Sequence, residues 1–276
     1  MPELPEVETI RRGLEARIKS RKILKVQVTR PRTLLGIDPK SFQSELLNQV
    51  FTSFERKAKY LFFIMQSGKV IVTHLRMSGS FRVQSLDTPN PSHTHMIFEL
   101  NRAEKLLFQD LRGFGKISLY PNFDAALNHA NVSRLAPEPL SDEFTLIYFQ
   151  EGLAQYKTRL KPLLLDQYRV VSGLGNIYVD ESLFHAGILP DRIANKLSKT
   201  EIKRLYLSIR KVIKDSIEAG GSSIRNYVRS DGDLGKYALN LFVYSRKRQN
   251  CRICETPIIY TRLAQRGTHY CPNCQV

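Results

Sequence analysis

The first residues of the chain place a potential nucleophile beside two acids. The sequence opens Met-Pro-Glu-Leu-Pro-Glu, and an initiator Met is normally removed when a small residue such as proline follows. Removal leaves Pro2 with a free secondary amine that titrates at about 8, so a useful fraction is neutral at pH 7. Such an amine can attack a sugar C1′, expel a base and form an iminium. Glu3 lies beside it, and Glu6 follows at i+3 on the same helical face.

The same residues also suit the start of a helix. Prolines and acids are favoured in first turns, and Val7, Ile10 and Leu14 recur at helical spacing behind them. Physical chemistry alone therefore leaves a covalent catalyst and a simple helix start both open, with the helix start favoured.

The four cysteines point to a metal site at the other end of the chain. They form two Cys-x-x-Cys pairs separated by sixteen residues, and all lie in the last 26 residues. This is the spacing of a two-knuckle zinc site, in which four thiolates close a tetrahedral, structural site with no open position for catalysis. Two disulfides are the alternative, but a reducing cytoplasm disfavours them. We expect one structural zinc ion held by Cys251, Cys254, Cys271 and Cys274.

The charge of the chain indicates a polyanionic partner. The 276 residues include 42 Lys and Arg against 26 Asp and Glu, a formal net charge of +16. An excess of this size most often serves nucleic acid, although a charge that only aids solubility and a basic membrane-surface protein are alternatives. No apolar run approaches the roughly 20 residues of a membrane span, and the N-terminus lacks a signal-peptide pattern. We therefore expect a cytoplasmic protein, associated with the nucleoid if bacterial.

The elements that must position these residues change character along the chain. The first part favours many short strands behind one helix, which indicates a sandwich or barrel. At the first strand Leu24, Val26 and Val28 alternate with polar residues. The expected strands cover residues 22–29, 59–65, 69–75, 96–100, 105–108 and 116–120.

The second part reads as helical. Pro137 and Pro139 mark a linker, and residues 200–218 form the clearest amphipathic helix. Residues 220–240 are rich in Gly, Ser and charge and read as a long loop, which is often functional. We expect an N-terminal domain over residues 1–130, a helical domain over 131–240 and a zinc finger over 241–276.

Six separate motifs, in the right order, resemble the formamidopyrimidine-DNA glycosylase family. The chain starts Pro-Glu-Leu-Pro-Glu-Val-Glu-Thr, and later segments resemble a strand start, two DNA-probing loops, a helix–two-turns–helix signature and a terminal zinc finger. The matching segments are residues 2–13, 56–61, 74–80, 110–115, 173–181 and 264–275. The resemblance implies an α+β multidomain fold, with a β-sandwich behind an N-terminal helix, then a helix–two-turns–helix domain with a zinc-finger hairpin.

The resemblance also implies a reaction. The family excises oxidised purines such as 8-oxoguanine and formamidopyrimidines, and then cleaves the strand by β,δ-elimination. By this analogy Pro2 forms the Schiff base, Glu3 protonates the opening sugar ring, and Lys59 assists β-elimination. Arg266 would bind the flanking phosphates and assist δ-elimination. Glu6 joins this catalytic set.

The partner implied is double-stranded damaged DNA, bound by a monomer with steeply salt-dependent affinity. The flipped base leaves a gap, which Met77, Arg112 and Phe114 would fill. The resemblance also suggests DNA contacts for His74 and His93. Residues 220–240 match the lid over the flipped base. Three further residues are expected to contact the backbone of the DNA: Lys157, Lys161 and Asn176.

The departures from the family pattern are few. Ser222 and Ser223 stand where Thr-Thr is usual, and Ser245 and Glu255 stand where Gly is common. Glu255 raises a question about the zinc knuckle, because Gly eases a positive φ there.

Two rival functions differ in what they predict. Endonuclease VIII, the sister enzyme, prefers oxidised pyrimidines, and Leu4 together with the Met77, Arg112 and Phe114 set argues against it. A non-catalytic zinc protein that kept the fold would bind DNA without a covalent intermediate, and the intact Pro2 argues against that.

Overall fold

The computed structural model describes residues 2–128, 130–222 and 237–276. Contacts divide the chain into two compact units. The first unit holds the chain up to Ser133 together with Gly220–Ser222, and the second holds Arg134–Ala219 together with residues 237–276. The expected lid over residues 220–240 lies mostly outside the described residues.

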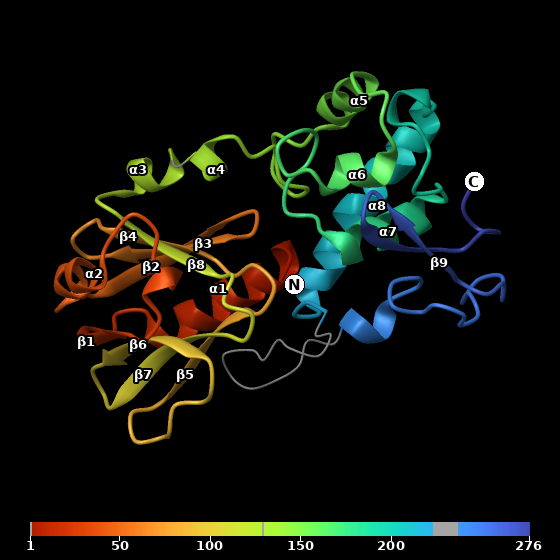
Figure 1. Ribbon diagram of the computed structural model, residues 1–276. Coiled ribbons are helices and arrows are strands. Elements are labelled where there is room, and N and C mark those ends of the chain that lie inside the picture. The colour runs from red at the N-terminus through yellow and green to blue at the C-terminus, as the bar shows by residue number, and fades with distance from the viewer. Residues whose placement is uncertain (1, 129, 223–236) are drawn as a thin grey trace. The chain divides into compact units, whose positions relative to one another are not determined.

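The first unit is a sandwich of two four-stranded antiparallel sheets (Figure 1). One sheet has the order β1-β6-β7-β5 and the other β2-β3-β4-β8. The strands are β1 (Ile23–Val28), β2 (Phe51–Lys57), β3 (Tyr60–Met65), β4 (Val70–His74), β5 (Gly79–Ser85), β6 (Thr94–Leu100), β7 (Glu104–Asp110) and β8 (Lys116–Tyr120). The helices are α1 (Leu4–Ile18), η1 (Pro31–Thr33), α2 (Pro39–Leu46), α3 (Phe123–Leu127) and α4 (Ala130–Ser133). The expected β-sandwich behind an N-terminal helix is confirmed.

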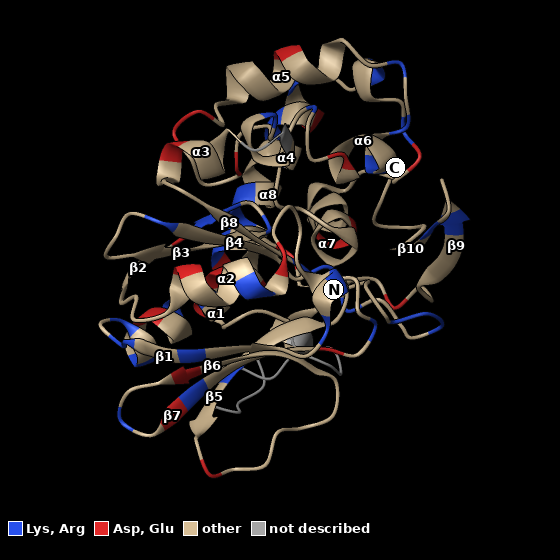
Figure 2. Ribbon diagram, turned by 60° about the vertical axis from the view of Figure 1, so that its left-hand side comes forward, with Lys and Arg blue, Asp and Glu red and all other residues tan. Residues whose placement is uncertain are grey.

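Aromatic side chains fill the space between the two sheets. Ring centroids lie 5.0 Å apart between Phe63 of β3 and Phe81 of β5, and 5.1 Å apart between Phe81 and Phe108 of β7. Such rings bury large apolar areas and prefer tilted contacts of this kind. Helix α1 lies between the sheets in Figures 1 and 2 and adds Val7, Ile10, Leu14 and Ile18 to the same core. The start of α1 is thereby fixed against the sandwich.

The first strand differs from its expected pattern. The strand forms as β1, but Leu24 is 49% exposed, whereas Ile23 and Val26 are buried. The register shifts between Ile23 and Lys25, where the strand pairs with β6. A bulge of this kind interrupts the two-residue alternation, so the apolar face changes side within the strand. The alternating pattern therefore does not place Leu24 on the buried face with Val26.

The second unit is built from short helices and a two-stranded hairpin. The 20-residue α8 is the amphipathic helix expected over residues 200–218, and a capping box between Ser198 and Glu201 starts it. The elements are α5 (Leu146–Ala154), α6 (Leu160–Leu165), α7 (Asn176–Ala186), η2 (Ala194–Lys196), α8 (Lys199–Glu218), η3 (Tyr237–Asn240), β9 (Ile259–Leu263) and β10 (Arg266–Tyr270). Inside the unit, Glu181 of α7 accepts hydrogen bonds from the amides of residues 242–244.

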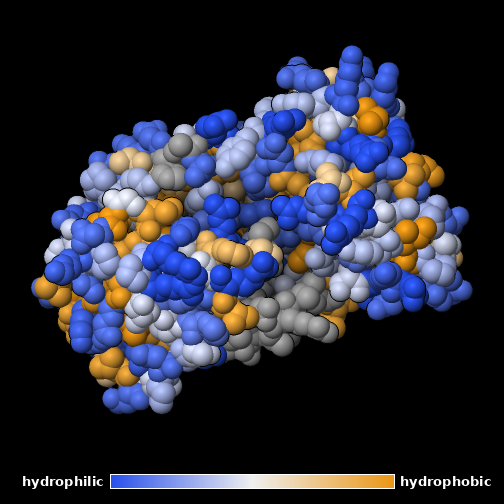
Figure 3. Space-filling view, viewed as in Figure 1, coloured by the Kyte–Doolittle hydropathy of each residue, from blue (hydrophilic) through white to orange (hydrophobic). Residues whose placement is uncertain are grey.

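The surface is polar and predominantly basic. Lys and Arg occur on both units, on strands, helices and loops (Figure 2). On the face in Figure 3, hydrophobic residues are scattered among hydrophilic ones. Among the described residues, no helix is both long and apolar enough to cross a membrane.

Candidate active site

Helix α1 begins at the residues that could do chemistry. Pro2 and Glu3 are buried, and Glu3 is only 2% exposed. Glu3 is the N-cap residue, and Pro5 occupies the first turn, where its missing N–H costs nothing. The helix signal and the catalytic signal in the sequence are therefore compatible, because one segment can satisfy both.

Glu6 holds this segment in place. One of its carboxylate oxygens accepts a hydrogen bond from the Glu3 amide at 2.9 Å. The other accepts from the amide and the hydroxyl of Ser222, at 2.7 and 3.0 Å. Gly221 adopts a left-handed φ of +83°, and a Cβ there would lie 3.0 Å from the Glu6 carboxylate. This geometry indicates that Glu6, which was expected to belong to the catalytic set, positions the N-terminus.

Lys59 lies in the two-residue turn that joins β2 to β3. Lys57 and Tyr60 close this hairpin, and Ala58 takes a left-handed φ of 49°. The Ala58 carbonyl accepts a hydrogen bond from Arg56 at 3.0 Å. The Lys59 side chain is 7% exposed, which is unusual for lysine. The turn therefore holds a lysine in a largely dry environment instead of on the open surface.

A buried carboxylate connects α1 to the Lys59 turn. Glu8 of α1 accepts from Arg56 of β2 at 3.0 Å, and also pairs with Arg11 and Arg12. Burial alone would raise the pKa of Glu8, but the hydrogen bonds from Arg11 and Arg12 and the charge of Arg56 lower it to about 2. In the sequence, the only signal for a role of Glu8 is the pair of arginines at i+3 and i+4.

His74 ends β4 beside Tyr60, with ring centroids 4.6 Å apart. Burial, and then the charges of Arg76 and Lys59, lower its pKa to about 3, so the ring is neutral at physiological pH. Its Nδ1 accepts from the Arg76 amide at 3.0 Å, which leaves the proton on Nε2. A DNA contact by His74 would therefore be a neutral hydrogen bond and not an ion pair.

Three residues are expected to fill the gap that a flipped base leaves: Met77, Arg112 and Phe114. They are called the wedge residues below. Met77 is 42% exposed and Phe114 is 50% exposed, although both are apolar. The Arg112 guanidinium lies 5.0 Å from the centroid of the Phe114 ring, within cation–π distance. His93 is also exposed, in a turn before β6. Both apolar side chains are therefore accessible to a binding partner.

In the second unit, the Asn176 side chain is hydrogen-bonded within the protein, whereas Lys157 is exposed to solvent. Asn176 is the first residue of α7, and its side-chain amide donates to the Gly267 carbonyl at 2.8 Å. Its Oδ1 is buried without a hydrogen-bond partner in the described part of the chain. Lys157 is exposed in the loop before α6, where a phosphate could reach it.

Lys161 does not lie where a DNA contact would require it. It was expected to contact the DNA backbone, but its side chain is fully buried. The ammonium pairs with Asp180 at 2.6 Å and donates to the Gly267 carbonyl at 2.8 Å. Asp180 also accepts from the His269 amide at 2.9 Å. Because leaving these partners would strand a buried charge, Lys161 and Asp180 instead fasten β10 to helices α6 and α7.

Arg266 is presented by the tip of the β9–β10 hairpin. Leu263 and Arg266 close a two-residue turn in which Ala264 and Gln265 both have positive φ, at 47° and 62°. This is the primed type of turn that matches the twist of a hairpin, usually made with Asn or Gly. Arg266 is exposed, so its guanidinium is free to reach a phosphate.

The four cysteines fit a structural zinc ion. All four sulfur atoms lie within 4.8 Å of one another. The Cys251–Cys274 and Cys254–Cys271 sulfurs are 3.8 and 3.4 Å apart. Tetrahedral Zn–S bonds of about 2.3 Å require sulfurs roughly 3.8 Å apart, whereas a disulfide would bring them to about 2.05 Å. Glu255 has a φ of 62°, so the knuckle keeps the left-handed backbone although Gly is absent.

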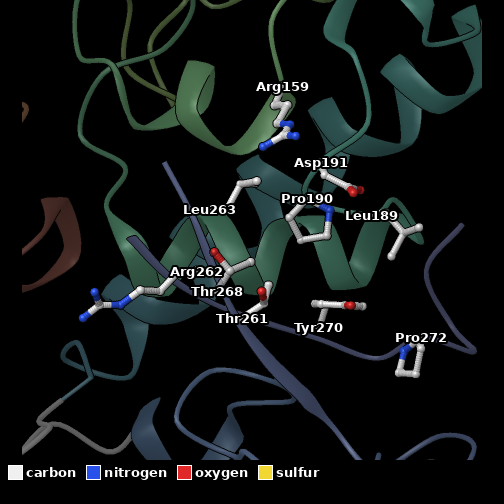
Figure 4. A pocket seen from close by; sticks show the side chains of 10 residues that line it. All are labelled: Arg159, Leu189, Pro190, Asp191, Thr261, Arg262, Leu263, Thr268, Tyr270 and Pro272. Carbon is white, nitrogen blue, oxygen red and sulfur yellow. The ribbon is translucent and has the colours of Figure 1, made fainter. Parts of the chain in front are cut away.

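A cavity of about 450 Å³ lies beside the hairpin in the second unit (Figure 4). Leu263, Thr268 and Tyr270 line it from the hairpin, and Arg159 and Asp191 from the preceding helical part. Its lining contains none of the expected catalytic residues. The cavity is therefore separate from the residues for which the sequence predicts a catalytic role.

The sequence matches three family models. They are described as the formamidopyrimidine-DNA glycosylase N-terminal domain over residues 1–117, its H2TH (helix–two-turns–helix) domain over residues 135–228, and a zinc finger found in FPG and IleRS over residues 249–276. Together with the observed sandwich and cysteine cluster, these matches define a zinc-finger DNA glycosylase.

Curated relatives and solved structures agree. The chain is 41% identical to formamidopyrimidine-DNA glycosylase of Enterococcus faecalis and 42% identical to that of Geobacillus kaustophilus, covering all of this chain and 97% and 100% of theirs. A structure of Lactococcus lactis Fpg with abasic-site DNA has a TM-score of 0.93 at 37% identity, with both chains fully covered. The chain therefore belongs to the formamidopyrimidine-DNA glycosylase family, whose members are glycosylases with AP lyase activity, and the zinc finger holds one structural zinc ion.

Proposed function

We propose that this enzyme removes 8-oxoguanine and formamidopyrimidines from duplex DNA and cleaves the strand by β,δ-elimination through a Schiff base on Pro2. The observation that carries the proposal is the burial of Pro2 and Glu3 at the start of α1, fixed by Glu6. Relatives solved with Fapy-dG DNA and with carbocyclic 8-oxo-G DNA support the class of lesion.

The first step is displacement of the base. The Pro2 nitrogen forms a bond to C1′ and loses its proton, the bond between C1′ and the base breaks, and the base leaves with the electron pair and takes up one proton. Glu3 delivers a proton to the ring oxygen, and opening of the sugar converts the amine adduct to an iminium. Because the iminium itself accepts electrons, no metal is needed at the reaction centre.

The second step is strand cleavage. Loss of a C2′ proton breaks the bond to the 3′ phosphate, and Lys59 would assist this β-elimination. Arg266 would stabilise the phosphate that leaves in the subsequent δ-elimination, because a guanidinium matches phosphate geometry with two donors. The proposed duplex contacts come from the wedge residues, His74, His93, Lys157 and Asn176. We expect the enzyme to act as a monomer.

Product analysis separates the two eliminations. A 5′-labelled duplex with 8-oxoguanine opposite cytosine should give a 3′-phosphate product with the wild-type enzyme. Arg266→Ala should stop mainly at the unsaturated aldehyde of β-elimination, whereas Arg262→Ala, one strand position from the same turn, should still give the phosphate. A variant that binds DNA normally and still completes δ-elimination would contradict the role of Arg266. Cleavage confined to oxidised pyrimidines would favour the endonuclease VIII alternative.

A further inference from the structure

Three exposed segments of the first unit meet at one buried aspartate. Asp110, the last residue of β7, is 1% exposed. The segments are the Met77 loop before β5, the turn at His93 before β6, and the loop that carries Arg112 and Phe114. Asp110 begins the fourth of the matching motifs, residues 110–115, and no function was predicted for it.

The contacts of Asp110 reach all three segments. Its Oδ1 accepts from the Ser78 hydroxyl and, at 3.2 Å, from the Arg112 amide. Its Oδ2 accepts from the Gly115 amide at 2.6 Å. Its own amide donates to the His93 carbonyl at 3.0 Å. One residue is therefore bonded to each segment that carries a proposed DNA-contacting side chain.

Ser78 links two of the segments directly. Its hydroxyl donates to Asp110 and accepts from the Arg112 amide at 3.0 Å. Ser78 follows Met77 in sequence, so this hydroxyl joins the Met77 loop to the backbone of Arg112. The positions of the wedge residues are consequently coupled through two side chains, Asp110 and Ser78.

The backbone of these segments needs such support. Each contains one residue with a left-handed φ: Arg76 at 55°, His93 at 59° and Gly113 at 66°. For the two residues that are not glycine this conformation costs about 1 kcal/mol or more. A strained turn persists only where surrounding contacts determine it, and the hydrogen bonds of Asp110 are contacts of that kind.

The hydrophobic core fixes Asp110 and the loop from below. A Cβ added at Gly115 would lie 2.6 Å from the Phe108 ring and 3.0 Å from the Asp110 carboxylate. Phe108 belongs to the aromatic core of the sandwich. The loop backbone therefore packs directly against the buried Phe108 ring. The hydrogen bonds of Asp110 then restrict the positions that the exposed loop residues can take.

We propose that Asp110, together with Ser78, is a positioning residue that holds the wedge residues and His93 in one arrangement for opening the base stack. This proposal rests on the proposed function. Asp110 touches neither the sugar nor the base; it acts through the loops. Its loss should therefore impair the extrusion of a base from a duplex far more than the chemistry at Pro2.

Two variants test the proposal. Ser78→Ala removes the hydroxyl that links the loops. Asp110→Asn replaces one acceptor oxygen with an amide NH₂, which cannot accept from the Gly115 or Arg112 N–H. Ser80→Ala, two residues further along the chain, is the matched control. If Asp110→Asn fails to fold, Ser78→Ala alone tests the proposal. This variant removes only a hydroxyl from a half-buried residue.

Two reactions separate positioning from general damage. Single-turnover excision of 8-oxoguanine from a duplex requires base extrusion, whereas lyase cleavage of a single-stranded abasic oligonucleotide does not. A 2-aminopurine next to the lesion reports unstacking, and the chain contains no tryptophan to add background emission. Both test variants should lose tenfold or more in duplex excision and most of the 2-aminopurine amplitude. Their single-strand lyase rates and the Ser80→Ala rates should stay within twofold of wild type.

Discrimination of the orphan base gives a further readout. Because Arg112 is proposed to face the orphaned base, the preference for cytosine over adenine opposite the lesion should shrink in both test variants. Duplex excision within twofold of wild type would overturn the proposal. Equal losses in both reactions, with an unchanged melting temperature, would also overturn it. Failure of the wild-type enzyme to form a borohydride-trapped adduct would instead remove the proposed function.

Discussion

Two hairpin turns carry a candidate catalytic side chain, and they are held in different ways. Lys59 lies in the β2–β3 turn, inside a four-stranded sheet with an aromatic core. Arg266 lies at the tip of β9–β10, a two-stranded hairpin whose first strand is mostly exposed. Both turns use left-handed residues that are not glycine. The first has a large apolar core beneath it, whereas the second relies on a metal and on the buried Lys161–Asp180 pair.

This difference indicates that the size of the surrounding fold determines what stabilises a turn. Two strands alone are at best marginally stable in water, and small modules need a metal or a disulfide. A sandwich buries enough apolar surface to hold a turn without either. We therefore expect each turn to fail under a different perturbation.

Zinc removal should have the largest effect, and it should be confined to the Arg266 turn. Structural zinc contributes roughly 10–16 kcal/mol to folding of small fingers. Chelation, followed by release of one zinc per chain, should weaken duplex binding by about 100-fold, since two lost phosphate contacts are worth about 3 kcal/mol.

Hydrogen exchange supplies the control for this comparison. Amides of β9 and β10 should lose protection after chelation, whereas amides of β2 and β3 should keep theirs. Equal loss of protection in both hairpins would mean that the sandwich also depends on the metal, and the comparison would fail.

A pH-dependent effect should be specific to the Lys59 turn. The folded pKa of Glu8 is about 2 against an ordinary 4.5, so its stabilisation is present above pH 4.5 and is lost as the pH falls towards 2. Glu8→Gln should lower the free energy of unfolding by up to about 3 kcal/mol at pH 7 and by much less at pH 3. Urea unfolding at the two pH values measures this.

Glu15→Gln is the matched control for Glu8. Glu15 lies on the same helix and also pairs with Arg11, but it is partly exposed, so its loss should cost less than about 1 kcal/mol. A Glu8→Gln loss that is the same at both pH values would show that the charge of Glu8 is not what stabilises the turn.

The smallest expected effect is a gain in the zinc finger. Glu255 has a φ of 62°, where an L residue is strained and glycine is not. Glu255→Gly should raise the stability of the finger by up to about 1 kcal/mol, measured as the chelator concentration that releases half the zinc. Glu255→Ala should give no gain, because alanine keeps the Cβ; a gain with alanine would point to the charge instead.

The sequence predicted most of this architecture, because the deciding signals were local. Alternation and turn residues located six of the eight strands of the sandwich, and the cysteine spacing located the metal site. Leu24 was assigned to the wrong face because a bulge in the pairing with β6 leaves no trace in the strand itself. The strands β2 and β5 and the helix α2 were not predicted, since their apolar patterns are short.

Residues that supply a reactive or metal-binding group could be recognised from the sequence. Residues that only hold other residues in position could not. Pro2, Glu3 and the cysteines are recognisable by type and spacing. Lys161 appeared as a free cation because its partner Asp180 lies 19 residues away in sequence. Asp110 gave no signal because its carboxylate accepts from backbone amides, which every residue type except proline offers, and from a serine on another segment. Buried polar partnerships depend on tertiary structure and need coordinates.

The proposed chemistry depends on a secondary amine at Pro2. Borohydride reduction during reaction with a duplex containing 8-oxoguanine opposite cytosine, followed by mass mapping of the adduct, tests this directly. We expect one covalent adduct on the N-terminal peptide, located at Pro2, in protein that lacks Met1. An adduct on Lys59, or none in protein confirmed to begin at Pro2 and to bind the duplex, would contradict it.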